Sequence, residues 1–207
     1  AYAVDFDGDG RRDLWAADAG DALASTANYL ARFGWERGAP AAVEARLPEG
    51  FDWALVDASV RRPAGIWSAL GVTRADGGAL PEAGEAALIA PAGARGPVFA
   101  IYDNFGVIRR YNNATSYALA VSHLADRIAG GGPYRGAWPR GDRALSRAET
   151  EEIQRRLTAL GHDTGGVDGI LGPNTRAAIR GFQRATGRIP DGYASAALLE
   201  ALRAAGG

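Results

Sequence analysis

The feature that most constrains the fold is a stretch with no helical or strand periodicity, AGGGPYRGAWPRGDR, at residues 129–143. Three consecutive glycines and two prolines disfavour both helix and strand, and no apolar face repeats along the stretch. Such a composition is typical of a linker. It predicts that the 207-residue chain divides into a first domain at residues 1–130, a linker at 131–143 and a smaller domain at 144–204.

The segment after the linker has the apolar spacing of three helices. The first is predicted to begin after Ser146, because Glu149 three residues later completes a capping-box pattern. The second follows GPNT, with Asn174 or Thr175 as its cap, and the third runs from about Ser195. The apolar residues expected to face inward are Ile153, Leu157, Leu160, Ala178, Ile179, Phe182, Ala185, Leu198, Leu199 and Leu202.

The first segment is predicted to be helical near both ends and β-rich or irregular in between. DALASTANYLARFG at 21–34 and TSYALAVSHLADRIAG at 115–130 have helical spacing. Between them, ALVDASV, AALIAP and GPVFAIYD have the pattern of short strands bounded by proline and glycine. The expected fold class is therefore mainly α with a small β or irregular subregion. In the second helix, the residues expected to pack inward are Leu119, Val121, Leu124 and Ile128.

The composition excludes several classes of site. The chain has no cysteine, which excludes disulfides, cysteine-zinc sites and thiol nucleophiles. Its formal net charge of -1 gives no overall attraction to nucleic acid or to an anionic membrane. His123 and His162 are far apart and lack metal-ligand spacing. We expect no nucleic-acid partner, no membrane contact from this segment, no organic cofactor, and a monomer.

The stretch DFDGDGRRD at residues 5–13 matches the opening of an EF-hand-type calcium loop. Ca²⁺ prefers six to eight oxygen ligands, and alternate aspartates on a tight turn can direct their carboxylates to one point. Glycine at the sixth position of the loop allows the bend. The predicted ligands are Asp5, Asp7, Asp9, the backbone carbonyl of Arg11, and Asp13.

The loop departs from the EF-hand pattern at its twelfth position, where Ala16 stands in place of the expected glutamate. Asp18 or Asp21 must then supply the closing carboxylate, and Asp21 is the candidate ligand. The alternative interpretation is a solvated Asp/Gly turn that caps the next helix. Repulsion among three close carboxylates favours a bound cation. We expect a structural Ca²⁺, because no coordination position is left for a substrate.

Longer stretches resemble two known families. YAVDFDGDGRRDLW, DALASTANYLARFGW and RRYNNATSYALAVSHLADRI resemble the membrane-bound lytic transglycosylase B family of bacterial murein hydrolases, over roughly residues 2–130. GGVDGILGPNTRAAIRGFQRATG resembles the peptidoglycan-binding domain type 1. Residues 40–95 match only loosely. The resemblance implies the C-terminal portion of a lysozyme-like catalytic domain joined to a three-helix peptidoglycan-binding module, in the periplasm or cell envelope of a bacterium.

The resemblance also implies a reaction. The family cleaves the β-1,4 bond between N-acetylmuramic acid and N-acetylglucosamine and forms a 1,6-anhydro product, with one glutamate acting as acid and then as base. In the family this glutamate lies on a helix upstream of the acidic loop. No glutamate of this chain has that context, so we expect a fragment with no catalytic residue and no activity of its own. The alternatives are a non-catalytic peptidoglycan-binding protein and a calcium-stabilised structural domain.

The stretch RYNNATSY lines the glycan groove in the family, which implies that Tyr111, Asn112 and Tyr117 contact substrate here. Asparagine can hydrogen-bond acetamido and hydroxyl groups, and tyrosine rings can stack on sugars. The alternative is that Asn112 caps the following helix while the tyrosines are packing residues.

In the C-terminal segment, most of the family motif consists of residue types with structural roles, so the motif identifies a fold more surely than a binding surface. The tripeptide PDG at 190–192 is a weaker echo of VDG at 167–169. His162 and Arg176 are candidate surface contacts. The motif residues are Asp168, Gly169, Gly172, Thr175, Phe182 and Gln183.

Overall fold

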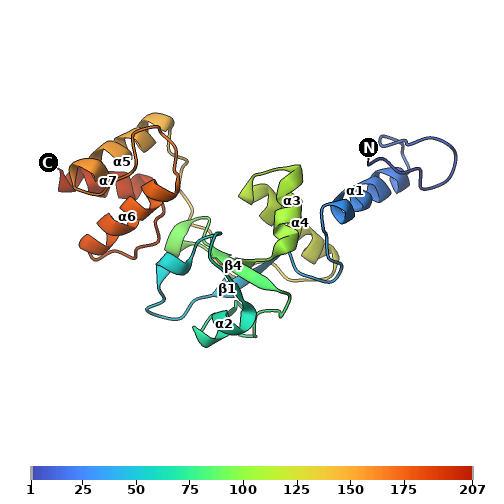
Figure 1. Ribbon diagram of the computed structural model, residues 1–207, viewed down its shortest axis with the longest axis horizontal. Coiled ribbons are helices and arrows are strands. Elements are labelled where there is room, and N and C mark those ends of the chain that lie inside the picture. Colours follow the sequence, from blue (N-terminus) through green and yellow to red (C-terminus); the bar gives the residue numbers. More distant parts are fainter. Residues whose placement is uncertain (1, 207) are drawn as a thin grey trace.

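The computed structural model describes residues 2–206, so Ala1, where the predicted first domain begins, lies outside the described residues. The expected fold class is confirmed: helices predominate and a small antiparallel sheet lies in the middle of the chain. Figure 1 shows α1 (Gly20–Arg32) projecting from one side of the sheet region. The C-terminal helices gather on the opposite side.

The sheet has the strand order β2-β4-β5-β1-β3, and neighbouring strands are antiparallel. The central strand is β5 (Val98–Ile101), in which Phe99 pairs with Glu44 of β1 (Ala42–Arg46) and with Ile89 of β4 (Glu85–Ile89). The edges are β2 (Arg61–Pro63) and β3 (Thr73–Arg74).

Alternation of side chains along β5 divides the core of the first domain into two layers. Val98 and Ala100 pack with Trp67 of α2 (Ala64–Ala69) on one face of the sheet. Phe99 and Ile101 pack on the other face, against α3 (Asp103–Tyr111) and α4 (Thr115–Ile128). Because both faces are covered, the strand reads as an unbroken apolar run in the sequence.

The C-terminal module consists of α5 (Arg147–Ala159), α6 (Pro173–Ala185) and α7 (Ala196–Ala205) around a shared apolar core. The capping box of Ser146 and Glu149 is confirmed, and α7 begins after its cap Ser195 as predicted. The prediction for the start of α6 was wrong. Its cap is Gly172, because Pro173 at the first helical position has a fixed φ and needs no N–H partner.

Several residues predicted to face inward are instead exposed, namely Leu124, Ile128, Leu160 and Ala185. The helix α4 is 14 residues long and its neighbour α3 only 9, so the last turns of α4 extend past their partner. Leu124 and Ile128 lie on those turns and are 60% and 79% exposed.

The predicted strand ALVDASV at residues 54–60 was also wrong. This stretch contains the end of a short 3-10 helix (Trp53–Leu55) followed by turns. Asp52 accepts a hydrogen bond from Ala54 N, and Asp57 accepts one from Ser59 N. Local side-chain bonds of this kind compete with strand pairing, and here they prevail.

Candidate functional site

Two of the three predicted groove residues, Tyr111 and Tyr117, line a cavity of about 460 Å³ between α1, α3 and α4. Tyr111 and Tyr117 stack with their ring centroids 6.1 Å apart, and Tyr29 of α1 meets Tyr111 edge-on at 6.0 Å. Trp35 and Pro40 also line this cavity with apolar surface. Tyr111 is 70% exposed, so its ring is available to a ligand. We call this cavity the aromatic pocket.

The local sequence explains why the two rings meet. The helix α3 ends at Tyr111, and Asn112 adopts an extended conformation that turns the chain. The side-chain oxygen of Asn112 then accepts a hydrogen bond from Ala114 N, just before α4 begins. Ala114 is the N-cap of α4 and no side chain caps that helix, so this bond shapes the turn and the alternative of Asn112 as a helix cap was wrong. Asn112 does not line the pocket either. Tyr111 and Tyr117 therefore stand on either side of one tight turn.

Sequence reasoning missed Tyr29, Trp35 and Asp126 as members of this pocket. Tyr29 and Trp35 lie more than 70 residues before the turn in the sequence. Burial raises the pKa of the Asp126 carboxyl above its ordinary value, and nearby His123 offsets part of that rise. His123 in turn stacks on Tyr134 at 3.9 Å. A carboxyl on helix α4 gives no signal in the sequence that it borders an aromatic cavity.

No glutamate is among the residues that line the aromatic pocket in the described part of the chain. The pKa values of Glu149 and Glu152 are lowered to about 2, mainly by hydrogen bonds from Arg143 and Arg203 respectively. A general acid needs the opposite shift. Glu44 binds the backbone N–H groups of Arg135 and Gly136. These contacts give the three glutamates structural roles.

The acidic loop brings Asp5, Asp7 and Asp9 together, with one carboxylate oxygen from each within 4.8 Å of the others. Gly8 and Gly10 have positive φ angles of 78° and 85°, which a residue with a Cβ rarely adopts. Asp5 accepts hydrogen bonds from the N–H groups of both glycines. The clustered carboxylate oxygens suit a hard cation such as Ca²⁺.

Asp21 lies apart from that cluster and ties the loop to helix α1. Its carboxylate is buried and accepts hydrogen bonds from Phe6 N at 2.7 Å and Asp13 N at 2.8 Å. Arg11 N donates to the Asp9 carboxylate. Among the predicted ligands, the structure thus brings the carboxylates of Asp5, Asp7 and Asp9 together. Asp13 contacts Asp21 through the hydrogen bond from its backbone N–H to the Asp21 carboxylate.

The motif of the C-terminal module forms a partly buried hydrogen-bond network. Gln154 of α5 donates to the Asp168 carboxylate and to Thr175, and its oxygen accepts from the N–H groups of Asp168 and Gly169. The Gln154 contact lowers the pKa of Asp168. Gln183 of α6 repeats the arrangement, with bonds to Asp191 and to the N–H of Gly192. The two Asp-Gly loops that echo each other in the sequence are therefore held in the same way. Phe182 is core, and Gly172 caps α6.

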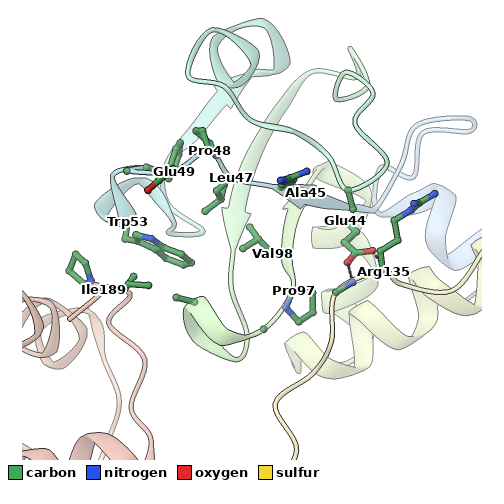
Figure 2. Close-up of a pocket in the computed structure, with 18 residues that line it drawn as sticks. Glu44, Ala45, Leu47, Pro48, Glu49, Trp53, Pro97, Val98, Arg135 and Ile189 are labelled. Atoms are coloured by element: carbon green, nitrogen blue, oxygen red, sulfur yellow. Dashed lines mark hydrogen bonds between the residues drawn. The ribbon is translucent and has the colours of Figure 1, made fainter. Parts of the chain in front are cut away.

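Part of the segment 131–143 contacts the first domain, since the Tyr134 and Trp138 rings lie beside Phe99 with centroids 4.9 and 6.1 Å away. Figure 2 shows the Glu44 carboxylate bound by Arg135 and its neighbour, at one end of a cavity of about 870 Å³. At the other end of this cavity, Ile189 of the C-terminal module lies opposite Trp53 of the first domain. The two parts of the chain thus share a cavity wall.

Comparisons with known proteins match both parts of the chain. Residues 1–126 match the transglycosylase SLT domain family, and residues 146–202 match a family of peptidoglycan binding domains. The crystal structure of SltB3 from Pseudomonas aeruginosa in complex with NAG-anhNAM-pentapeptide is 54% identical, with a TM-score of 0.88. That match covers 98% of this chain and 54% of the SltB3 chain.

A second SltB3 structure, in complex with NAG-NAM-pentapeptide, is 53% identical, has a TM-score of 0.88, and is matched over 97% of this chain and 54% of its own. Membrane-bound lytic murein transglycosylase B of Escherichia coli (strain K12) is 33% identical over 147 residues, which is 62% of this chain and 34% of that protein. The chain therefore spans about half of the SltB3 chain and about a third of the Escherichia coli protein. Within residues 2–206, no helix is both long and apolar enough to cross a bilayer.

Proposed function

The chain belongs to the transglycosylase SLT family, and from that membership we propose that it is part of a lytic murein transglycosylase. The proposed substrate is the glycan strand of peptidoglycan, cut between N-acetylmuramic acid and N-acetylglucosamine. The observation that carries the proposal is the aromatic pocket within the family domain, where Tyr29, Tyr111 and Tyr117 present ring faces and edges suited to sugars.

In the proposed reaction, the 6-hydroxyl oxygen of the muramyl residue forms a bond to C1 of the same sugar while the bond from C1 to the leaving oxygen breaks. An acid gives its proton to the leaving oxygen, and its conjugate base takes the hydroxyl proton. We assign this acid to no glutamate of this chain, because none lines the aromatic pocket in the described residues. We propose that the acid lies in a region of the protein that corresponds to the part of the relatives not matched by this chain.

The proposed role of the C-terminal module is to hold the enzyme on peptidoglycan, and the resemblance to peptidoglycan binding domains at residues 146–202 supports it. The proposed location is the bacterial cell envelope or periplasm, and the proposed state is a monomer. A non-catalytic peptidoglycan-binding protein is the alternative function, favoured by the absence of a glutamate from the pocket lining in residues 2–206.

The test is sedimentation with insoluble peptidoglycan, followed by mass spectrometry of the supernatant for 1,6-anhydromuropeptides. We expect this chain to bind without releasing them, and the full-length gene product to bind and release them. Binding by the full-length product without release would establish the alternative function. Release by the 207-residue chain would show that one of its own glutamates is the acid.

We also propose that the acidic loop binds a structural Ca²⁺. Asp5, Asp7 and Asp9 would hold it, with the Arg11 carbonyl, Asp13 and Asp21 as further ligands, and the ion would offset the repulsion among the carboxylates. Millimolar CaCl₂ is expected to raise the melting temperature, since a ligand that binds only the folded state stabilises it. The Asp7→Asn variant is the control and should lose the shift. An unchanged melting temperature for the unaltered chain would contradict the proposal.

A further inference from the structure

A second cleft, of about 710 Å³, lies between the first domain and the C-terminal module. One wall is formed by Asp57 and by Thr115 and Ser116 at the start of α4. The opposite wall is formed by Arg176 and Arg180 of α6. Further wall comes from Trp138 of the connecting segment and Tyr193 of the module. We call this space the inter-module cleft.

Specific contacts hold the two walls of the cleft together. The Asp191 carboxylate of the module accepts a hydrogen bond from Ala94 N of the first domain at 2.8 Å. The same carboxylate is oriented by Gln183 and by Tyr193 N. Arg95 forms an ion pair with Asp142 at 3.1 Å nearby. The cleft is thus a defined space between docked modules.

Two arginines and two aspartates line this cleft, and the Asp191 carboxylate already accepts hydrogen bonds from Ala94 N, Gln183 and Tyr193 N. Arg176 and Arg180 are four residues apart, hence on one face of α6, and neither forms a salt bridge with any residue between 2 and 206. Asp57 lies across from them. Burial raises the pKa of Asp57, but the hydrogen bonds from Ser59 and the positive charges of Arg180 and Arg176 together outweigh burial, so the pKa of Asp57 is lowered overall. The cleft therefore presents two arginines without a salt bridge and the Asp57 carboxylate held in its charged form, while the Asp191 carboxylate is taken up by hydrogen bonds within the protein.

The inter-module cleft is separated from the aromatic pocket by the first turn of α4. Thr115 and Ser116 line the cleft, while the next residue, Tyr117, lines the aromatic pocket. If a glycan binds on the tyrosine rings, a substituent of that glycan that passes over this turn would therefore reach the cleft.

We propose that the inter-module cleft binds the acidic stem peptide of peptidoglycan, with Arg176 and Arg180 donating hydrogen bonds to its carboxylates. The proposal rests on the proposed function, since the glycan would bring the peptide to the cleft. Paired guanidinium groups suit carboxylates. The opposing Asp57 disfavours a purely anionic ligand such as a nucleic acid and suits a peptide that also carries a free amine. Trp138 and Tyr193 offer apolar surface to alanine methyl groups.

Isothermal titration calorimetry on the intact 207-residue chain tests the proposal with three probes. The first is the free pentapeptide L-Ala-γ-D-Glu-diaminopimelate-D-Ala-D-Ala, the second is the same peptide with its carboxylates amidated, and the third is the peptide-free disaccharide GlcNAc-anhydroMurNAc. The double variant Arg176→Gln/Arg180→Gln is expected to bind the free pentapeptide about tenfold more weakly, because two charge-assisted bonds are lost. The control Arg184→Gln removes one positive charge from α6 outside the cleft, which matches the single change Arg176→Gln, and should bind as the unaltered chain does.

The outcomes separate this proposal from the proposed function. Loss of pentapeptide binding with retained disaccharide binding supports the cleft, as does weak binding of the amidated peptide. Equal pentapeptide binding by the double variant and the unaltered chain overturns it. If no protein binds the disaccharide, the result counts against the aromatic pocket as a glycan site and not against the cleft. If the double variant fails to fold, the single variant Arg176→Gln decides the question, because Arg176 is exposed. Its affinity for the free pentapeptide is expected to fall about threefold.

Discussion

At the scale of single residues, exposure and bonding separate structural polar groups from those free to bind. Gln154 is 1% exposed, and both ends of its amide are used within the module. Gln183 has a similar environment. Tyr111, in contrast, is 70% exposed and contacts other rings without being enclosed by them. Both kinds of residue belong to family motifs, so the motif alone does not reveal which of them binds a ligand.

The Tyr111→Ala variant is expected to bind peptidoglycan glycans about fivefold more weakly, because an aromatic face contributes about 1 kcal/mol beyond its buried area. Its melting temperature should change little, since the side chain is mostly exposed. Calorimetry with a peptide-free glycan measures the effect. The Tyr111→Phe variant keeps the ring and should bind nearly as the unaltered chain does. Equal affinity of all three proteins would remove Tyr111 from the proposed groove.

Glu152 predicts a pH dependence for the module. Hydrogen bonds from Arg203 and Arg156 lower its pKa from 4.5 to about 2. A lowered pKa in the folded state gives stability that is present above pH 4.5 and is lost as the pH falls towards 2. The melting temperature of the chain should therefore drop over this interval. In the Glu152→Gln variant the drop should be smaller, and an identical pH profile would contradict this role.

At the scale of elements, helices with local stop and start signals were predicted well. Helix α5 has a complete capping box, and α7 is capped by Ser195 through a bond to Leu198 N. These bonds join residues three positions apart, so a pattern of side chains is enough to specify them. The strands and helices of the middle region lack such signals, and α2 and α3 were not predicted at all.

The Ser146→Ala variant tests the cap of α5. Loss of an N-cap side chain is expected to reduce the free energy of unfolding of the module by about 1 kcal/mol. Chemical denaturation followed by circular dichroism measures this change. The matched control is Ser116→Ala, a serine within the first turn of α4 whose side chain makes no capping bond in that helix. A loss no larger than that of the control would mean that the cap contributes nothing measurable.

At the scale of the whole molecule, the two modules are joined by a close backbone contact at Gly93. Its φ of 65° favours glycine, and a Cβ at this position would lie 2.5 Å from the Asp191 carboxylate and 2.7 Å from Tyr193. Only the absence of a side chain allows the loop of the module to approach so closely. The adjacent bond from Ala94 N to Asp191 depends on this approach.

The Gly93→Ala variant is therefore expected to separate the modules at a cost of about 1–3 kcal/mol. Differential scanning calorimetry should show two transitions for this variant and one coupled transition for the unaltered chain, and small-angle scattering should show a more extended molecule. The control is Gly106→Ala, where an added Cβ meets nothing within 4 Å. Unchanged scattering in the Gly93 variant would show that the docking tolerates the added methyl group.

The sequence by itself determined the features that depend on neighbouring residues: the caps of α5 and α7, the acidic turn and the family of each part. The tertiary structure alone decided the order of the strands, the meeting of Tyr29 with Tyr111, and the placing of α6 against the first domain. The physical reason is separation along the chain. The bond from Ala94 to Asp191 joins residues 97 positions apart, and no local pattern records which distant partner a buried surface or a free N–H will find.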